Sequence, residues 1–264
     1  MQQVPYLDWN DSIRVLNRAY AAGLFVLIIG PKGTGKTSLV RDFAATRSRD
    51  LESVNFSLRT RESHLVGSRT LDQGTMGFDE GILIRSMKDG GILYLDELNA
   101  AEADVLLRLD EALDDRRQIV LKESSGDIIR AAQEWFVVAA INPLTHVGTK
   151  ELPPQLLSRF PVRIRLEYPP EDIELKIVKK HVRGDSDDHL LLGIRLANTL
   201  RRAAAVEELE YSPSIRETIA YGKMLDSGMS LREAADVIFG NVYAQWGGVE
   251  YRKVGDIIAS MFDS

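Results

Sequence analysis

Eight consecutive residues decide the fold of this chain: Gly30-Pro31-Lys32-Gly33-Thr34-Gly35-Lys36-Thr37. A short apolar run from Leu24 to Ile29 precedes them and is typical of a buried strand. The residues from Ser38 to Ala44 follow them and are typical of the first turns of a helix. Glycines in such a turn can adopt positive φ and bring backbone N–H groups close to an anion. The stretch therefore predicts a strand, an anion-binding loop and a helix, in that order.

The spacing of these residues, G-x-x-x-x-G-K-[ST], is that of a phosphate-binding loop. The N-terminus of the helix that follows adds partial positive charge to the loop. Lys36 is expected to reach the β- and γ-phosphates of a nucleoside triphosphate, and the Thr37 hydroxyl is expected to ligate Mg²⁺. A nucleoside triphosphate and Mg²⁺ are thus the predicted ligands of the loop. The predicted nucleotide-binding residues are Gly30, Pro31, Lys32, Gly33, Thr34, Gly35, Lys36, Thr37 and Ser38.

Composition excludes some other classes of function. The chain has 264 residues, a formal net charge of −6 and no cysteine. Without cysteine there can be no disulfide, Cys-ligated zinc or Cys nucleophile, and a reducing, cytoplasmic location is expected. The acidic balance argues against general nucleic-acid binding, which usually leaves a basic footprint. We also expect no signal peptide and no membrane span, because the apolar runs are short.

Strands alternate with helices up to about residue 166, which predicts a parallel sheet with crossover helices. The expected strands are 24–29, 51–56, 92–95, 135–141 and 162–166, and the expected helices 11–22, 38–47, 78–89 and 100–113. Residues 59–89 are expected to form an insertion whose first part, 59–77, is a loop. Residues 116–130 are expected to form a β-hairpin.

Tyr168-Pro169-Pro170 predicts a domain boundary, because the pattern beyond it is entirely helical. Helices are expected over 171–183, 186–205, 213–226, 230–243 and 249–262. The predicted fold class is α/β, a three-layer nucleotide-binding core with a parallel sheet, followed by a small all-helical lid domain. The core is predicted to span residues 1–168 and the lid residues 169–264.

Two further strands are expected to end in polar side chains beside the loop. The strand 92–95 runs into Asp96, which would hold Mg²⁺, and Glu97, which would orient and polarise the attacking water. The strand 135–141 runs into Asn142, which could contact the γ-phosphate or position the water. An ordinary Asn-Pro turn is the alternative for Asn142.

Four segments in order resemble the motifs of the AAA+ ATPases: Gly30–Thr37, Leu95-Asp96-Glu97, Asn142-Pro143 and Leu156-Leu157-Ser158-Arg159-Phe160. More narrowly, the chain resembles the MoxR class, which includes CbbQ-, NorQ- and GvpN-like members. Residues 78–91, which run into the acidic strand, and Leu98-Asn99-Ala100-Ala101 after it carry this narrower resemblance. The hairpin near 118–129 resembles the pre-sensor hairpin of the same clade. The resemblance covers nearly the whole chain and is weakest in the C-terminal quarter.

The resemblance implies roles for three residues. Asn142 would be the sensor-1 residue. Arg159 would be an arginine finger acting on ATP bound to a neighbouring subunit, with a solvated or locally paired arginine as the alternative. Arg216 would be the sensor-2 residue, although many family members place this arginine directly after Ser-Pro; a plain helix-surface arginine is the alternative. The predicted catalytic set is Lys36, Glu97, Asn142, Arg159 and Arg216.

The resemblance also implies a homo-oligomeric, typically six-membered ring that hydrolyses ATP and remodels or activates a protein substrate. MoxR-class ATPases typically act with a von Willebrand factor A domain protein. CbbQ-like members reactivate inhibited Rubisco, NorQ-like members mature nitric oxide reductase and GvpN-like members serve gas vesicles; the sequence does not choose among these.

Two other functions stay open at this point. A DNA-directed AAA+ motor or loader is disfavoured by the hairpin tip, Glu123-Ser124-Ser125-Gly126-Asp127, which carries no Lys or Arg. A monomeric P-loop small-molecule kinase fits the Arg159 segment and the helical C-terminal domain poorly.

Overall fold

The computed structural model describes residues 5–72, 75–122, 126–143, 150–184 and 186–263. The chain divides into two compact units by its internal contacts. The larger unit comprises residues 10–31 and 35–166, and the smaller unit comprises residues 1–9, 32–34 and 167–264. The domain boundary between residues 168 and 169 stays a prediction.

A five-stranded sheet in the order β2-β5-β8-β1-β9 forms the centre of the larger unit. Its strands are β1 (Val26–Ile29), β2 (Leu51–Asn55), β5 (Ile92–Asp96), β8 (Phe136–Ile141) and β9 (Val162–Arg165). All neighbouring strands are parallel. The predicted parallel sheet is confirmed.

The first strand begins later than the sequence pattern suggested. Leu24 is 42% exposed, and its N–H donates to the carbonyl of Ala19 at 2.9 Å. Leu24 therefore closes the end of helix α1 (Ser12–Ala21) and does not pair with β8 or β9. Gly23, at φ +66°, makes the turn between helix and strand.

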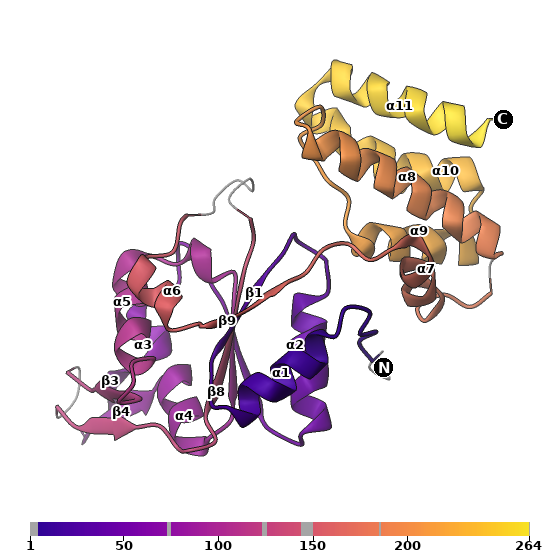
Figure 1. The fold of residues 1–264 in the computed structure, drawn as a ribbon. Coiled ribbons are helices and arrows are strands. Elements are labelled where there is room, and N and C mark those ends of the chain that lie inside the picture. The colour runs from indigo at the N-terminus through magenta and orange to yellow at the C-terminus, as the bar shows by residue number, and fades with distance from the viewer. Residues whose placement is uncertain (1–4, 73–74, 123–125, 144–149, 185, 264) are drawn as a thin grey trace. The chain divides into compact units, whose positions relative to one another are not determined.

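Helices cover both faces of the sheet, as Figure 1 shows. Helices α1 and α2 (Lys36–Thr46) lie on one face, and α3 (Glu62–Leu65), α5 (Ala103–Ala112) and α6 (Pro154–Ser158) lie on the other. The central strand β8 is apolar along its length, because both faces of a parallel sheet are covered. Its residues Val137 to Ala140 have no exposed surface. The predicted three-layer α/β fold is confirmed.

The insertion over 59–89 contains more strand than expected. After α3 comes an antiparallel hairpin of β3 (Gly67–Asp72) and β4 (Thr75–Glu80), and then α4 (Ile82–Asp89). The prediction of a loop up to residue 77 and a helix from residue 78 was wrong, because Phe78 pairs with Arg69 across the hairpin. Gly81 lies between β4 and α4, and a Cβ at this position would overlap the carbonyl of Leu65.

The described part of the second predicted hairpin is confirmed. Strand β6 (Gln118–Val120) pairs antiparallel with β7 (Ile128–Arg130). Residues 123–125 at its predicted tip lie outside the described residues. The helix expected over 100–113 is divided into a 3₁₀ turn, η1 (Leu98–Ala100), and α5.

The smaller unit is helical over its C-terminal part, as predicted. Its helices are α7 (Glu171–Lys179), α8 (Asp187–Ala205), α9 (Ile215–Asp226), α10 (Leu231–Ala235) and α11 (Gly248–Phe262). The helix expected over 230–243 ends early, and a π turn, η2 (Asp236–Gly240), and a 3₁₀ segment, η3 (Asn241–Trp246), follow α10. Apolar side chains from these helices form one buried cluster that includes Leu200, Tyr221 and Phe239. Within the described ranges, no helix has the length and apolarity needed to cross a bilayer.

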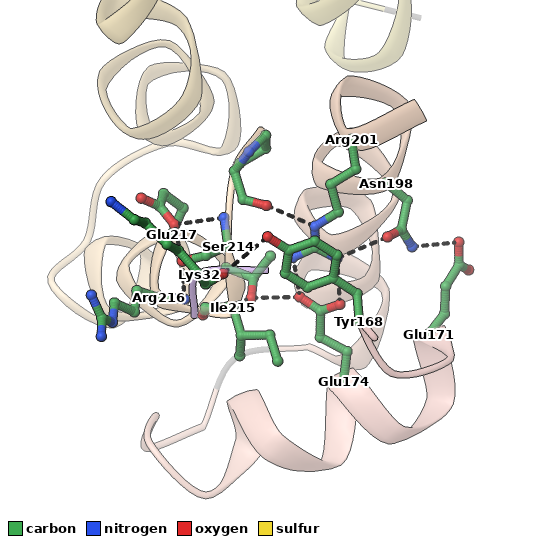
Figure 2. A network of polar contacts seen from close by, with 12 residues as sticks. Lys32, Tyr168, Glu171, Glu174, Asn198, Arg201, Ser214, Ile215, Arg216 and Glu217 are labelled. Carbon is green, nitrogen blue, oxygen red and sulfur yellow. Dashed lines mark hydrogen bonds and ion pairs between the residues drawn. The ribbon is translucent and has the colours of Figure 1, made fainter. Parts of the chain in front are cut away.

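A buried ion pair joins α7, α8 and α9 (Figure 2). Glu174 has no exposed surface, and Arg201 donates to its two carboxylate oxygens at 2.7 and 2.9 Å. Thr218 donates to the same carboxylate at 2.8 Å, and Arg201 Nε donates to the Pro213 carbonyl at 2.8 Å. The ring of Tyr168 lies 4.1 Å from the Arg201 guanidinium carbon. Because both buried charges are matched and hydrogen-bonded, the pair fixes the chain before α9 against α7 and α8.

Candidate nucleotide site

The phosphate-binding loop joins the carboxyl end of β1 to the first turn of α2. Gly33 and Gly35 have φ of +71° and +93°, a region that glycine adopts without a Cβ clash. Gly30 is required for another reason, since a Cβ there would overlap the carbonyl oxygen of Leu166. Gly35 is the N-cap of α2, so the first turn of this helix, whose N–H groups point away from the helix, begins at the loop. This backbone fits the phosphate group that the motif implies.

Lys36 is only 7% exposed, and three oxygen atoms hold its ammonium group. Nζ donates to the carbonyls of Gly30 and Pro31 at 2.6 and 2.8 Å. It also donates to Asn142 Oδ1 at 2.9 Å. Asn142 follows the last residue of β8, the neighbour of β1, so the parallel register brings the predicted sensor to the predicted phosphate-binding lysine.

The two predicted Mg²⁺ ligands also lie together. Thr37 Oγ1 donates to Asp96 Oδ2 at 3.0 Å. A hydroxyl beside a carboxylate supplies the hard oxygen donors that Mg²⁺ prefers, and Mg²⁺ usually takes its other ligands from phosphates and water. Among the described residues, no group of three or more His, Cys, Asp or Glu side chains could hold a metal.

Tyr94 lies beside this pair, and sequence reasoning did not single it out. Its hydroxyl oxygen is 3.5 Å from Thr37 Oγ1. Burial first, and the negative charge of Asp96 next, raise the pKa of the Tyr94 hydroxyl well above its ordinary value. The hydroxyl therefore stays neutral and adds no charge beside Asp96.

Glu97 occupies a fixed turn at the end of β5. Its φ is +55°, and its N–H donates to Asp96 Oδ1 at 3.0 Å. A non-glycine residue in this conformation costs of order 1–3 kcal/mol, so the surrounding structure must hold it there. The turn places Glu97 directly after Asp96, the hydrogen-bond partner of Thr37, at the end of β5.

Asn99 joins the turn after Glu97 to Asn142. The Asn99 side chain is 2% exposed, and its amide contacts the backbone of Asn142. Sequence reasoning used Asn99 only as part of a family resemblance. The available signal was its position, three residues after Asp96 and next to two small residues, Ala100 and Ala101.

The structure does not bring Arg159 together with these groups. Arg159 ends α6, on the face of the sheet opposite α2 (Figure 1). Its Nε donates to Asp110 Oδ1 on α5 at 2.9 Å, and this hydrogen bond raises the pKa of the guanidinium. Arg159 also precedes β9 by three residues, and Val162 at the start of β9 aligns with Val26 at the start of β1. The phosphate-binding loop follows the other end of β1.

Arg216 belongs to the smaller unit, in the first turn of α9. Ser214 caps this helix, accepting from the Arg216 N–H at 3.1 Å and donating its own N–H to Glu217 at 2.8 Å. The Arg216 side chain is exposed and points away from the buried ion pair (Figure 2). The same unit contains loop residues 32–34, and a Cβ on Gly33 would overlap the Cβ of Ser214.

Lys32 makes a further contact inside that unit. The Tyr168 hydroxyl donates to the Lys32 carbonyl at 3.0 Å, and Figure 2 shows the Tyr168 ring against Arg201. Two loop residues therefore contact the chain on either side of the buried ion pair: Lys32 contacts Tyr168, which precedes α7, and Gly33 contacts Ser214, which precedes α9.

Comparison with known proteins agrees with this geometry. A family model described as "AAA domain (dynein-related subfamily)" matches residues 25–160. Protein NorQ of Paracoccus denitrificans is 33% identical over 88% of this chain and 84% of the relative. The chain belongs to the MoxR class of AAA+ ATPases. The denitrification regulatory protein NirQ of Pseudomonas aeruginosa is 32% identical to this MoxR-class chain, over 88% of each.

A solved structure resembles this MoxR-class chain in fold. It is a crystal structure of a candidate ATPase from Cytophaga hutchinsonii. The TM-score is 0.51 at 20% identity, over 94% of this chain and 88% of the other. At this identity the likeness supports the fold alone.

Removing the Thr37 hydroxyl tests the metal pair. In Thr37→Val the Mg²⁺ site loses an oxygen ligand, so the Mg²⁺ concentration for half-maximal ATP hydrolysis should rise at least about tenfold. Thr37→Ser keeps the hydroxyl and should behave as the unmodified protein. Thr46→Val, on the same helix, removes only a hydrogen bond to the Phe43 carbonyl and should leave the Mg²⁺ requirement unchanged. An unchanged requirement in Thr37→Val would contradict the assignment.

Proposed function

We propose that this chain is a MoxR-type chaperone, a cytoplasmic AAA+ ATPase that forms a ring, with six copies expected. It would couple ATP hydrolysis to the remodelling or activation of a protein partner, acting with a von Willebrand factor A domain protein. The membership of the chain in the MoxR class supports this proposal.

The arrangement of the site supports hydrolysis of the β–γ phosphate bond. ATP bound with Mg²⁺ would supply the phosphoryl group and a cation that neutralises charge. Lys36 would hold phosphate oxygens, and Thr37 and Asp96 would hold the metal. Glu97, leaving β5 from its fixed turn, would orient the water and polarise it. Asn142 would position the water from the side of Lys36.

The position of Arg159 is the observation that supports the proposed ring. Its guanidinium pairs with Asp110 on α5, a helix on the face of the sheet opposite α2, so it does not complete the site of its own chain. An arginine supplied by a neighbouring subunit can stabilise transition-state charge and contributes about 10³–10⁵ in kcat. A monomeric small-molecule kinase gives Arg159 no comparable role. Arg216, at the start of α9, would act as sensor 2.

The relatives support a role exerted through another macromolecule. NirQ is named a denitrification regulatory protein, and a regulatory role is compatible with action on a protein partner. The net charge of −6 favours a protein partner over DNA. From these names we transfer to this chain a regulatory role, but no particular target.

Mixed assemblies test the trans action of Arg159. Arg159→Ala should bind ATP normally but hydrolyse it at least about 10³-fold more slowly. Lys36→Ala should be inactive for lack of nucleotide binding, yet it keeps Arg159. In rings assembled at random from equal amounts of both, one interface in four pairs an intact loop with an intact arginine, so about a quarter of normal activity should return.

Arg14→Ala is the control for the arginine change, because Arg14 lies on α1 and forms an exposed pair with Asp11. It should retain full activity alone, because it keeps both an intact loop and Arg159. Inactive mixed rings, once co-assembly is verified by tandem tags, would reject the trans-acting role.

A variant that binds ATP without hydrolysing it tests the partner. Glu97→Gln should lose at least about 10²-fold in hydrolysis while keeping ATP affinity, because it lacks the group that polarises the water. In ATP it should bind a von Willebrand factor A domain protein of the same genome at least about tenfold more tightly than Lys36→Ala does. Glu102→Gln, which alters an exposed pair with Lys150, should match the unmodified protein. Equal binding by Glu97→Gln and Lys36→Ala would contradict ATP-dependent partnership.

A further inference from the structure

Asn99 uses both ends of its side-chain amide on one neighbour, the backbone of Asn142. Its Nδ2 donates to the Asn142 carbonyl oxygen at 3.0 Å, and its Oδ1 accepts from the Asn142 N–H at 3.4 Å. Both residues are buried, at 2% and 3% exposure. If either residue lost its partner, its buried polar groups would lack a hydrogen bond. This costs about 1–3 kcal/mol of folding free energy per group.

The backbone of Asn142 needs such a partner because the sheet ends before it. The Ile141 carbonyl accepts from the Gly30 N–H at 3.2 Å, and this is the last contact of β8 with the chain leaving β1. Pro143 follows and has no N–H, and a residue before proline is restricted to extended conformations. A primary amide supplies one donor face and one acceptor, so Asn99 pairs with Asn142 much as a neighbouring strand would.

This pairing has a consequence for the site. Asn142 Oδ1 accepts from Lys36 Nζ at 2.9 Å, so the backbone that Asn99 holds carries a side chain in direct contact with the loop lysine. Asn99 itself lies in η1, two residues after Glu97. Its carbonyl accepts from the Lys150 N–H at 3.0 Å, which fixes the turn from a second side.

We propose that Asn99 is a positioning residue that locks Asn142 to the turn carrying Glu97, so that base and sensor keep one fixed relative placement. The proposal rests on the ATPase function proposed above and assigns a positioning role at that site to a residue outside the predicted catalytic and nucleotide-binding sets. Asn99 acts through the Asn142 backbone. A misplacement of about 1 Å at a positioned group can cost on the order of 10²-fold in rate.

Two variants at position 99 probe the amide directly. Asn99→Ala removes both hydrogen bonds, and Asn99→Asp keeps the shape and the acceptor but sets a carboxylate against the Asn142 carbonyl. Both should lower kcat about 10–100-fold and change the affinity for a fluorescent ATP analogue with Mg²⁺ less than about threefold. A normal kcat in Asn99→Asp would overturn the proposal.

Asn17→Ala is the matched control. The Asn17 side chain also accepts hydrogen bonds in the larger unit, from Arg47 at 2.7 and 3.2 Å, and lies on α1. The Asn17→Ala variant should lose a comparable number of hydrogen bonds, and its kcat should not change. A similar fall in kcat in Asn17→Ala would show that general loosening explains the effect, and would overturn the proposal.

A double-variant cycle separates action through Asn142 from an independent effect. If Asn99 works by placing the Asn142 side chain, Asn99→Ala should cost nothing further in an Asn142→Ala background. Multiplication of the two separate losses would contradict the proposal.

Amide hydrogen exchange supplies a readout that needs no nucleotide. In full-length protein, the Asn142 N–H should exchange faster in Asn99→Ala than in Asn17→Ala, because its acceptor is gone. Unchanged protection of Asn142 together with a reduced kcat would overturn the proposed route. Failure of the ATPase function would appear differently, as absence of hydrolysis in the unmodified protein.

Discussion

The ammonium group of Lys36 lies between two carbonyl oxygens of its own loop and the side-chain oxygen of Asn142. A charge this deeply buried must be matched by nearby oxygens, or its burial would cost several kcal/mol. The match requires β1 and β8 to be neighbours in parallel register, because only then do the loop and Asn142 meet at one edge of the sheet. The other groups at the site follow from the same register, since β5 lies on the far side of β8 and ends at Asp96, with Glu97 directly after it.

Neighbouring side chains hold several of the groups at this edge of the sheet. Thr37 is paired with Asp96, the Glu97 N–H with the Asp96 carboxylate, and the backbone of Asn142 with the amide of Asn99. Groups placed in this way lose little further freedom when a nucleotide binds, which is the physical basis of preorganised electrostatic stabilisation. Arg159 stands outside this set and carries its charge on another face. In the function proposed for this chain, the arginine of a neighbouring copy would supply the cation that Arg159 does not supply to its own site.

The sequence predicted the parts of the structure whose signals are local. The octapeptide predicts a loop followed by a helix. The apolar runs before Asp96 and Asn142 predict strands, because both faces of such strands are buried. The structure has these elements at those positions. The hairpin over 67–80 escaped prediction because Leu71 and Met76 are exposed, so the buried alternation that marks a strand is missing. The helix expected over 230–243 was divided by a π turn, which has no simple sequence pattern.

Pairings between distant elements could not be read from the sequence either. The amide of Asn99 on Asn142, the Asp110 partner of Arg159 and the buried pair of Glu174 with Arg201 depend on which elements the fold brings together. Composition and periodicity carry no record of such contacts, and a single sequence offers no covariation to reveal them.

The most direct test of the central claim, that a neighbouring copy completes each site, is turnover per chain measured as a function of protein concentration in saturating ATP and Mg²⁺. Assembly should be followed in the same samples by sedimentation, starting from the 29.5 kDa single chain. A shared site predicts turnover that is near zero for single chains and rises to a plateau as multi-chain assemblies form. Turnover per chain that stays constant down to concentrations at which only single chains sediment would contradict the account.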